Sequence, residues 1–122
     1  TVTEGNSDYN FYRFPHPGIF FRVDAPREAH ISLNPLDFEA VPRMEILLGV
    51  ANNTRSIIRI NGNTDVVNVS TPNILSDAGW SGFRVALANW MVLVFREADQ
   101  FPFMGFNVQE FYVVNYYGLR TP

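Results

Sequence analysis

Cysteine and lysine are both missing from this 122-residue chain, and each absence excludes a class of chemistry. Without cysteine there is no disulfide framework, thiolate nucleophile or cysteine-ligated metal. All nine basic residues are arginine, which excludes Schiff-base catalysis and the phosphate-binding lysine of a P-loop. No two of the eight glycines are separated by a single residue. The chain therefore lacks the Gly-x-Gly loop that Rossmann-type cofactor sites require.

Excess positive charge and long apolar runs are also missing. The formal net charge is −3, which argues against sequence-independent binding to nucleic acid. The longest apolar stretch covers residues 85–95 and is interrupted by Asn89. A membrane-spanning helix needs about 20 apolar residues. We therefore expect neither a nucleic-acid partner nor a membrane span.

Apolar and aromatic residues are plentiful, at 47% and 15% of the chain, so we expect one domain over residues 1–122 with a substantial core. Turn-forming residues recur about every ten residues, and no long window keeps a helical period. This pattern predicts an all-β fold, an antiparallel two-sheet sandwich of jelly-roll-like type with little helix. The one short-helix candidate is residues 73–78. The expected strands are residues 19–23, 30–33, 44–50, 55–60, 66–70, 83–88, 90–96 and 111–117.

The first of two expected hairpins turns at Asn61-Gly62. A three-residue loop over residues 61–63 pairs Arg59 with Asp65 and Ile58 with Val66. Opposite charges and β-branched residues are favourable cross-strand partners, so we prefer this loop to a two-residue one. The Arg59–Asp65 pair is expected on the sheet surface.

The second hairpin is expected to turn at Ala88-Asn89, which aligns Phe83 with Val94, Val85 with Val92 and Leu87 with Trp90. Asn89 tolerates the positive φ that such a turn needs. The opposite face then carries Met91, Leu93 and Phe95. A strand that is apolar on both faces is either central in a sandwich or covered by a bound partner. We expect the second face to hold an apolar ligand or a second copy of the chain.

Catalytic residue types are few. His16 lies between two prolines, and His30 begins an expected strand. His30 could form a dyad or a metal site with Asp24 and Glu28, but a hydrogen-bonded strand histidine is the favoured interpretation. We assign no catalytic residue and no metal site, and we expect a protein that is not an enzyme and requires no cofactor.

Aromatic residues near loops and strand ends suit recognition instead. Trp80, Tyr112, Tyr116 and Tyr117 lie there, and exposed aromatics beside Arg, Asp and Asn are typical of sugar or protein binding. Core packing is the alternative. The apolar segment 101–106 either covers one end of the core or lines an apolar pocket. The candidate ligand-binding residues are Trp80, Trp90, Met91, Leu93, Phe95, Phe103 and Tyr116.

Two sequons begin at Asn52 and Asn68, which makes both asparagines candidate glycosylation sites. The chain begins Thr-Val-Thr-Glu-Gly, with neither a basic start nor an apolar leader. We therefore expect a processed product or an excised domain, and a secreted glycoprotein.

Several short motifs follow one another in a defined order. Val-Asp-Ala at residues 23–25 precedes Ala-His-Ile-Ser-Leu at 29–33, and Met-Glu-Ile-Leu-Leu-Gly at 44–49 precedes Asn-Thr-Arg-Ser-Ile-Ile-Arg at 53–59. Phe-Arg-Val at 83–85, residues 91–95, Pro-Phe at 102–103 and Val-Val-Asn-Tyr-Tyr-Gly at 113–118 complete the series. In this order the motifs resemble the farnesoic acid O-methyltransferase-like domain of invertebrates. The resemblance covers about residues 10–120.

The resemblance implies an extracellular β-sandwich module, found alone or beside other recognition domains. Val50 replaces the second glycine of a family Gly-Gly pair, and Ala88-Asn89-Trp90 replaces a family Asp-x-Gly turn. We do not transfer the methyltransferase activity, because no S-adenosylmethionine loop is visible. The leading hypothesis is a non-catalytic secreted module, lectin-like or adhesive, that binds carbohydrate or protein. The alternatives are a carrier of an apolar isoprenoid such as a carotenoid or farnesoid, at a sheet face or subunit interface, and, third, a methyltransferase.

Overall fold

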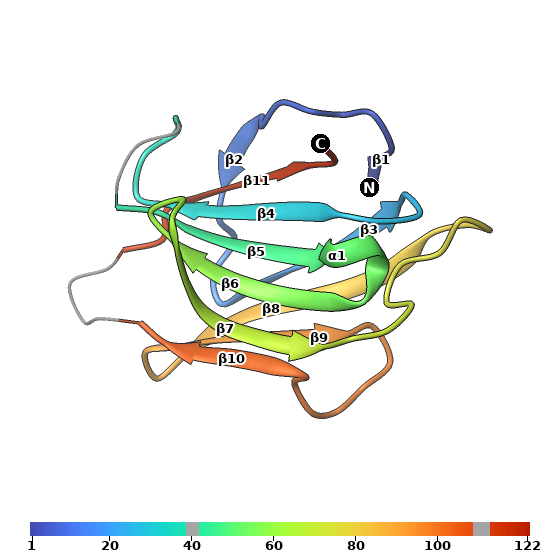
Figure 1. Ribbon diagram of the computed structural model, residues 1–122. Coiled ribbons are helices and arrows are strands. Elements are labelled where there is room, and N and C mark those ends of the chain that lie inside the picture. Colours follow the sequence, from blue (N-terminus) through green and yellow to red (C-terminus); the bar gives the residue numbers. More distant parts are fainter. Residues whose placement is uncertain (39–41, 109–112) are drawn as a thin grey trace.

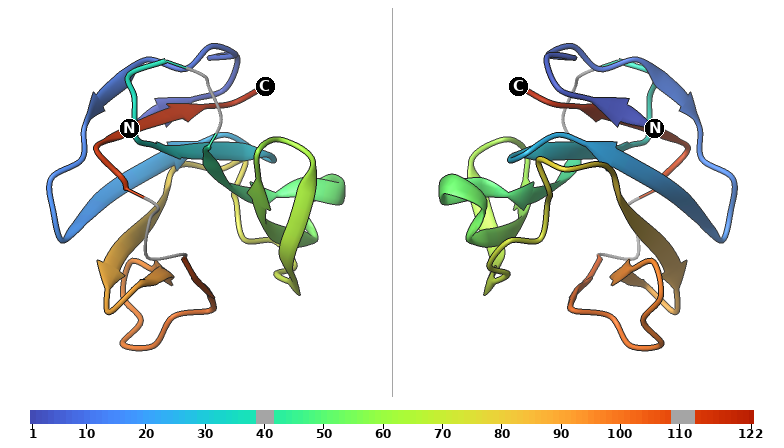
Figure 2. Two further views of the ribbon diagram at one scale, coloured as in Figure 1. Left: turned by 90° about the vertical axis from the view of Figure 1, so that its left-hand side faces the viewer. Right: turned by 90° about the vertical axis from the view of Figure 1, so that its right-hand side faces the viewer.

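The computed structural model describes residues 1–38, 42–108 and 113–122, and these form two β-sheets that face each other across a hydrophobic core (Figures 1 and 2). One helical turn, α1, lies at the end of the fifth strand. The elements in chain order are β1 (Val2–Thr3), β2 (Phe11–Arg13), β3 (Gly18–Asp24), β4 (Ala29–Asn34), β5 (Met44–Gly49), α1 (Val50–Asn53), β6 (Arg55–Ile60), β7 (Thr64–Ser70), β8 (Ser81–Ala88), β9 (Met91–Arg96), β10 (Met104–Asn107) and β11 (Tyr116–Arg120).

The five-stranded sheet has the order β1-β3-β8-β9-β10, and the six-stranded sheet has the order β2-β11-β4-β5-β6-β7. Neighbouring strands are antiparallel except β1, which pairs with β3 in parallel. The predicted all-β sandwich is confirmed, and the parallel β1 is an addition that the sequence did not predict. No helix in the described residues is long and apolar enough to cross a membrane.

The core follows from the alternation of side chains along each strand. Ile19, Phe21 and Val23 of β3 point inward and are buried, whereas Phe20 between them is half exposed. Strands β4 and β5 behave differently, because all their residues are buried. The outer face of the six-stranded sheet is therefore covered over these two strands.

The hairpin of β6 and β7 confirms the predicted surface pair. Arg59 lies opposite Asp65, and Arg59 Nε donates a hydrogen bond of 2.7 Å to Asp65 Oδ1. The predicted pairing of Ile58 with Val66 is wrong, because a register shift next to Ile58 places it opposite Val67. A bulge of this kind adds one residue to one strand and breaks simple register counting.

The hairpin of β8 and β9 turns one residue later than predicted, at Asn89-Trp90, with φ values of 51° and 64°. Leu87 therefore pairs with Val92 rather than Trp90, and Val85 pairs with Val94. The predicted partners were wrong, and the predicted faces are right for the residues of the two strands but not for Trp90, which lies in the turn and is 57% exposed. A shift of the turn by one residue moves the pairing by two, which preserves the side of the sheet on which each residue lies.

Other expectations need correction. Residues 73–78 form no helix, because the Asn53 side chain binds both the N–H and the C=O of Leu75 and fixes this segment as an irregular loop. The helical turn is α1 instead, where Ala51 and Asn52 have left-handed φ values. The apolar segment 101–106 contains the start of a strand, β10. Of the strand expected over residues 111–117, the first two residues, and with them Tyr112, lie outside the described residues, and β11 begins at Tyr116.

Candidate functional site

The structure divides the candidate residues between two sheets. Met91, Leu93 and Phe95 lie on the outer face of the five-stranded sheet, since they alternate with the inward Val92 and Val94. Met91 and Leu93 are half buried. Trp80 and Trp90 lie at opposite ends of β8, one before it and one after it.

Phe103 and Tyr116 lie elsewhere. Phe103 precedes β10, packs against the core and has the Arg96 guanidinium 5.6 Å from its ring centroid. Tyr116 lies in the six-stranded sheet, where Arg13 Nη1 donates to its hydroxyl at 3.3 Å. The structure therefore does not bring all seven candidates into one site.

Two exposed aromatic rings and one arginine form a platform on the outer face of the five-stranded sheet. Phe20 and Trp80 are 50% and 52% exposed. The Cζ atom of Arg22 lies 3.8 Å from the Trp80 ring centroid and 5.5 Å from that of Phe20. Stacking on an aromatic face stabilises a guanidinium and fixes its plane. We call Phe20, Arg22 and Trp80 the aromatic–arginine platform.

Glu97 lies beside the platform. Its Oε1 atom is 3.7 Å from Arg22 Nη2, and both side chains are about two-fifths exposed, at 42% and 41%. Glycine at position 82 makes room for it, because a Cβ there would overlap the Glu97 carboxylate. The platform and the adjacent Glu97 therefore place flat apolar surfaces, a cation and a carboxylate together on one face of the sheet.

Next to the platform, the outer face of the sheet is covered by the Arg84 side chain. Arg84 lies between Phe20 and Phe95 in the strand pairing. Its Cζ atom is 4.3 Å from the Phe95 ring centroid, and its Nη2 donates to the Asp99 carbonyl at 2.8 Å. Phe95 is consequently only 9% exposed. The arginine thus provides part of the cover that the sequence led us to expect from a partner.

A groove of about 320 Å³ adjoins the platform. Its floor is bare because Gly18 lies against β8, where an added Cβ would be 2.6 Å from the Val85 carbonyl oxygen. Phe20 is shared by the groove and the platform, so the two form a continuous surface. The groove is lined by Pro17, Gly18, Ile19, Phe20, Arg84, Val85 and Ala86.

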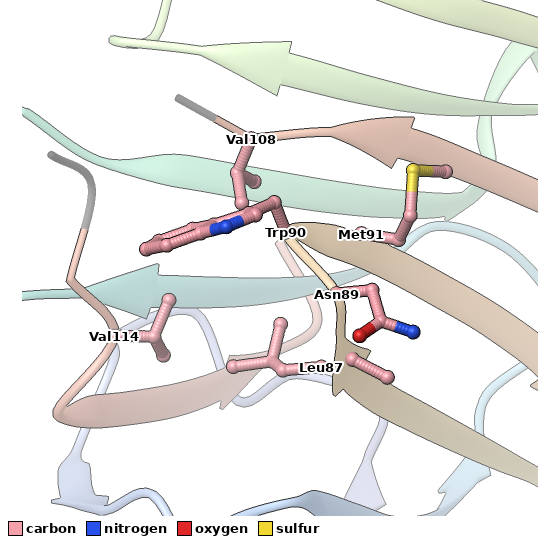
Figure 3. A pocket seen from close by; sticks show the side chains of 7 residues that line it. Leu87, Asn89, Trp90, Met91, Val108 and Val114 are labelled. Atoms are coloured by element: carbon pink, nitrogen blue, oxygen red, sulfur yellow. The ribbon is translucent and has the colours of Figure 1, made fainter. Parts of the chain in front are cut away.

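A second pocket, of about 350 Å³, lies beside Trp90, at the end of β8 away from Trp80, and its lining begins at Leu87, next to Ala86 of the groove. In the view of Figure 3 the Trp90 indole lies between Val108 on one side and Leu87 and Val114 on the other. The Trp90 carbonyl accepts a hydrogen bond of 2.7 Å from the Val108 N–H, which fixes this wall of the pocket. Met91 and Ala88 also line it, and Asn89 contributes a polar side chain to the described lining.

A buried polar cluster occupies the outer face of the six-stranded sheet. His30 Nε2 donates to Glu28 Oε1 at 3.1 Å, and Arg120 Nε donates to His30 Nδ1 at 3.2 Å. Burial lowers the pKa of His30, although the hydrogen bond to Glu28 opposes this shift. With both ring nitrogens engaged, His30 is a neutral hydrogen-bonded strand histidine.

The same cluster holds a buried carboxylate. The Tyr9 hydroxyl donates to Glu45 Oε2 at 2.8 Å, and Arg43 and Arg120 lie 3.5 and 3.6 Å from its oxygens. No group of three or more His, Cys, Asp and Glu side chains in the described ranges is placed to hold a metal ion. The cluster therefore covers β4 and β5 and holds β11 to them.

A family model described as farnesoic acid O-methyl transferase matches residues 5–122 of the sequence. The chain belongs to this family. The match covers the region over which the motif order suggested the resemblance. No curated protein matches the chain.

The sequons of this farnesoic acid O-methyltransferase family domain both lie on its surface. Asn52 is exposed in α1, and its Oδ1 accepts a hydrogen bond from Arg27. Asn68 is exposed in β7, and its Oδ1 accepts one from Arg55 Nε. Each amide nitrogen is the atom that a glycan would modify, so neither contact uses the reactive atom.

Sequence reasoning placed Arg84 on the outer face of this family domain but did not name it as a binding residue, and it missed Phe20, Arg22 and Glu97 altogether. Alternation along β3 was the available signal for Phe20 and Arg22, because it places both opposite the inward Ile19 and Phe21. A single exposed phenylalanine is ordinary on a protein surface, and Phe20 becomes a candidate only through its grouping with Arg22 and Trp80.

Proposed function

We propose that this domain is a non-catalytic binding module that recognises carbohydrate through the aromatic–arginine platform and the adjoining groove. The observation that carries the proposal is the placement of two half-exposed rings around Arg22 on one face. Sugar rings pack their C–H faces on aromatic side chains, while their hydroxyl groups bind planar polar groups such as guanidinium and carboxylate.

The groove favours a saccharide over a protein partner. Its volume of about 320 Å³ lies at the small end of ligand pockets. A stable protein interface buries about 800 Å² on each partner, which extends well beyond the platform. An adhesive role would then follow from binding the glycan of another molecule rather than from a protein interface.

A glycan array tests the proposal with matched tryptophan variants. We expect the native domain to bind a set of saccharides, and Trp80→Ala to bind them at least about tenfold more weakly, a loss of about 1.4 kcal/mol. Trp90→Ala is the control, since Trp90 is similarly exposed but lies at the other end of β8. Equal binding by all three proteins, or no binding by the native domain, would contradict the proposal.

We propose further that the domain needs no cofactor and transfers no methyl group. Support comes from His30, the buried histidine, whose two ring nitrogens are engaged by Glu28 and Arg120. Incubation with S-adenosylmethionine and farnesoic acid should leave the acid unchanged by mass spectrometry. Formation of the methyl ester would show that the domain is an enzyme.

The Trp90 pocket favours a second candidate function, binding of an apolar small molecule. Its lining is more apolar than polar, and its volume of about 350 Å³ suits a farnesoid chain better than a carotenoid. Native mass spectrometry of the purified protein would detect such a ligand, and Trp90→Ala should release it. Retention of the ligand by this variant would place it elsewhere.

An extracellular location is also proposed. It is supported by the exposure of both sequon asparagines and by the carbohydrate ligand proposed above. When the chain is expressed through a eukaryotic secretory pathway, enzymatic glycan removal should lower its mass. An unchanged mass would remove the support that the sequons give.

A further inference from the structure

We infer that the saccharide carries an anionic group, a carboxylate or a sulfate ester, that binds the guanidinium of Arg22. This inference rests on the proposed function and adds the ligand class. It starts from the geometry of Arg22, whose guanidinium stacks on Trp80 at 3.8 Å. A guanidinium stacked by its face presents its N–H edge as a flat fork, which matches two oxygens of a carboxylate or sulfate.

The donors of Arg22 are underused within the chain. Its Nε is buried and has no hydrogen-bond partner in the described structure. Its ion pair with Glu97 spans 3.7 Å, which is longer than a hydrogen bond. The accessible part of this side chain, which is 41% exposed, is therefore its Nη end. An anionic ligand that reaches the Nη atoms would make charge-assisted hydrogen bonds there, which are stronger than those of a neutral hydroxyl.

A second arginine that lies over an aromatic ring, Arg84, is a diagonal neighbour of Arg22 in the sheet. Arg84 faces Phe20 across the strands and covers Phe95, and its Nη2 donates to a backbone carbonyl rather than to a carboxylate. Diagonal neighbours in an antiparallel sheet are about 7–8 Å apart, so Arg22 and Arg84 can contact a single disaccharide. Arg84 also lines the groove, which connects this second cation to the proposed binding surface.

Glu97 makes the inference unusually testable, because it competes for Arg22. An anionic ligand must either displace this carboxylate or bind beside it against its charge. Asp24 lies farther along the same strand as Arg22 and is exposed. Removing the charge at Glu97 should therefore tighten binding, while removing the charge at Arg22 should weaken it. A purely structural role for the pair would not give opposite signs.

The experiment is calorimetric titration with three oligosaccharides of equal length, one neutral, one uronic-acid-containing and one sulfated. We expect the native domain to prefer at least one anionic probe over the neutral probe by tenfold or more, with binding that weakens as salt increases. Arg22→Gln should lose that preference and Arg22→Lys should keep part of it. Glu97→Gln should bind the anionic probe several times more tightly. Arg55→Gln, in the six-stranded sheet, is the matched control and should behave as the native domain.

The outcomes separate this inference from the proposed function. Equal binding of neutral and anionic probes, with no effect of Arg22→Gln or Glu97→Gln, overturns the inference and leaves carbohydrate binding intact. No binding of any saccharide by the native domain overturns both. If Arg22→Gln is unstable by thermal melting, Glu97→Gln and Arg22→Lys decide, because Arg22→Lys keeps the positive charge and Glu97 is an exposed residue beside the platform. Preference for the uronate or for the sulfated probe identifies the anion.

Discussion

At the scale of single residues, the buried carboxylate of Glu45 stabilises the polar cluster on the six-stranded sheet. Its carboxylate is nearly inaccessible and is surrounded by the Tyr9 hydroxyl and the guanidinium groups of Arg43 and Arg120. Glu45→Gln would leave two cations beside a neutral amide. We expect the free energy of unfolding to fall by about 2–3 kcal/mol, measured by urea denaturation. The exposed Glu97→Gln should change it by less than about 0.5 kcal/mol, and a similar loss in both variants would contradict this account.

His30 should make stability depend on pH. Burial holds its pKa below the ordinary value of 6.5, against the opposing influence of Glu28 and Glu45 and with that of Arg120. The unfolded chain therefore binds a proton first as the pH falls, so stability is full above about pH 6.5 and decreases below it. Subtracting the pH profile of His30→Gln isolates this contribution. Two parallel profiles between pH 7.5 and 5.5 would show that His30 does not titrate in this way.

Residue pairs differ in how far the sequence reveals them. Arg59 and Asp65 were predictable because a short turn places them opposite each other. Arg22 and Trp80 were not, because Arg22 lies in β3 and Trp80 in the loop before β8, and they meet only through the pairing of β3 with β8. Local geometry fixes the first contact, whereas the second depends on the sheet order.

At the scale of elements, the β8–β9 turn carries strain. Trp90 has a φ of 64°, a conformation that costs a bulky residue about 1–2 kcal/mol. Trp90→Gly creates Asn-Gly, the preferred pair for a two-residue turn. We expect the variant to unfold with a free energy about 1 kcal/mol higher, by urea denaturation, and to lose any apolar ligand from the pocket.

Asn89→Gly is the control for the Trp90→Gly variant, which is expected to gain stability and lose the apolar ligand. It relaxes the other positive φ of the turn, 51°, and leaves the indole in place. It should therefore keep the ligand. A less stable Trp90→Gly would mean that packing of the indole outweighs the backbone strain.

The alternation of apolar and polar residues predicted most of the strands. The wrong predictions of the β8–β9 turn and of the short helix are explained by local backbone conformation. The turn was misplaced because tryptophan is not a turn-forming residue, yet Trp90 takes a left-handed conformation. The prediction of a helix over residues 73–78 was wrong because the Asn53 side chain binds the backbone of Leu75 and holds this segment as a loop. Self-association through Met91 and Leu93 stays a prediction, and Arg84 already covers Phe95 beside them.

At the scale of the whole molecule, the candidate surfaces depend on how the strands assemble. The platform combines Phe20 and Arg22 of β3 with Trp80 from the loop before β8. The Trp90 pocket combines the β8–β9 turn with Val108 and Val114, which flank β10 and β11. The sequence marked both tryptophans but gave no means of separating them into two sites.

The separation of these sites gives a prediction for the whole domain. Trp80 and Trp90 are the two tryptophans of the chain, and the eight residues of β8 hold them roughly 26 Å apart along an extended strand. Fluorescence of Trp90→Phe reports on Trp80 alone, and that of Trp80→Phe reports on Trp90 alone. An acidic saccharide should change the emission of Trp80 only, because Trp80 contacts Arg22 in the proposed binding platform, whereas Trp90 lies in the turn at the far end of β8. An apolar ligand should change the emission of Trp90 only. A saccharide that changes the Trp90 emission would show either that the sites are coupled or that the saccharide occupies the sandwich end, and in both cases the division into two independent surfaces would be wrong.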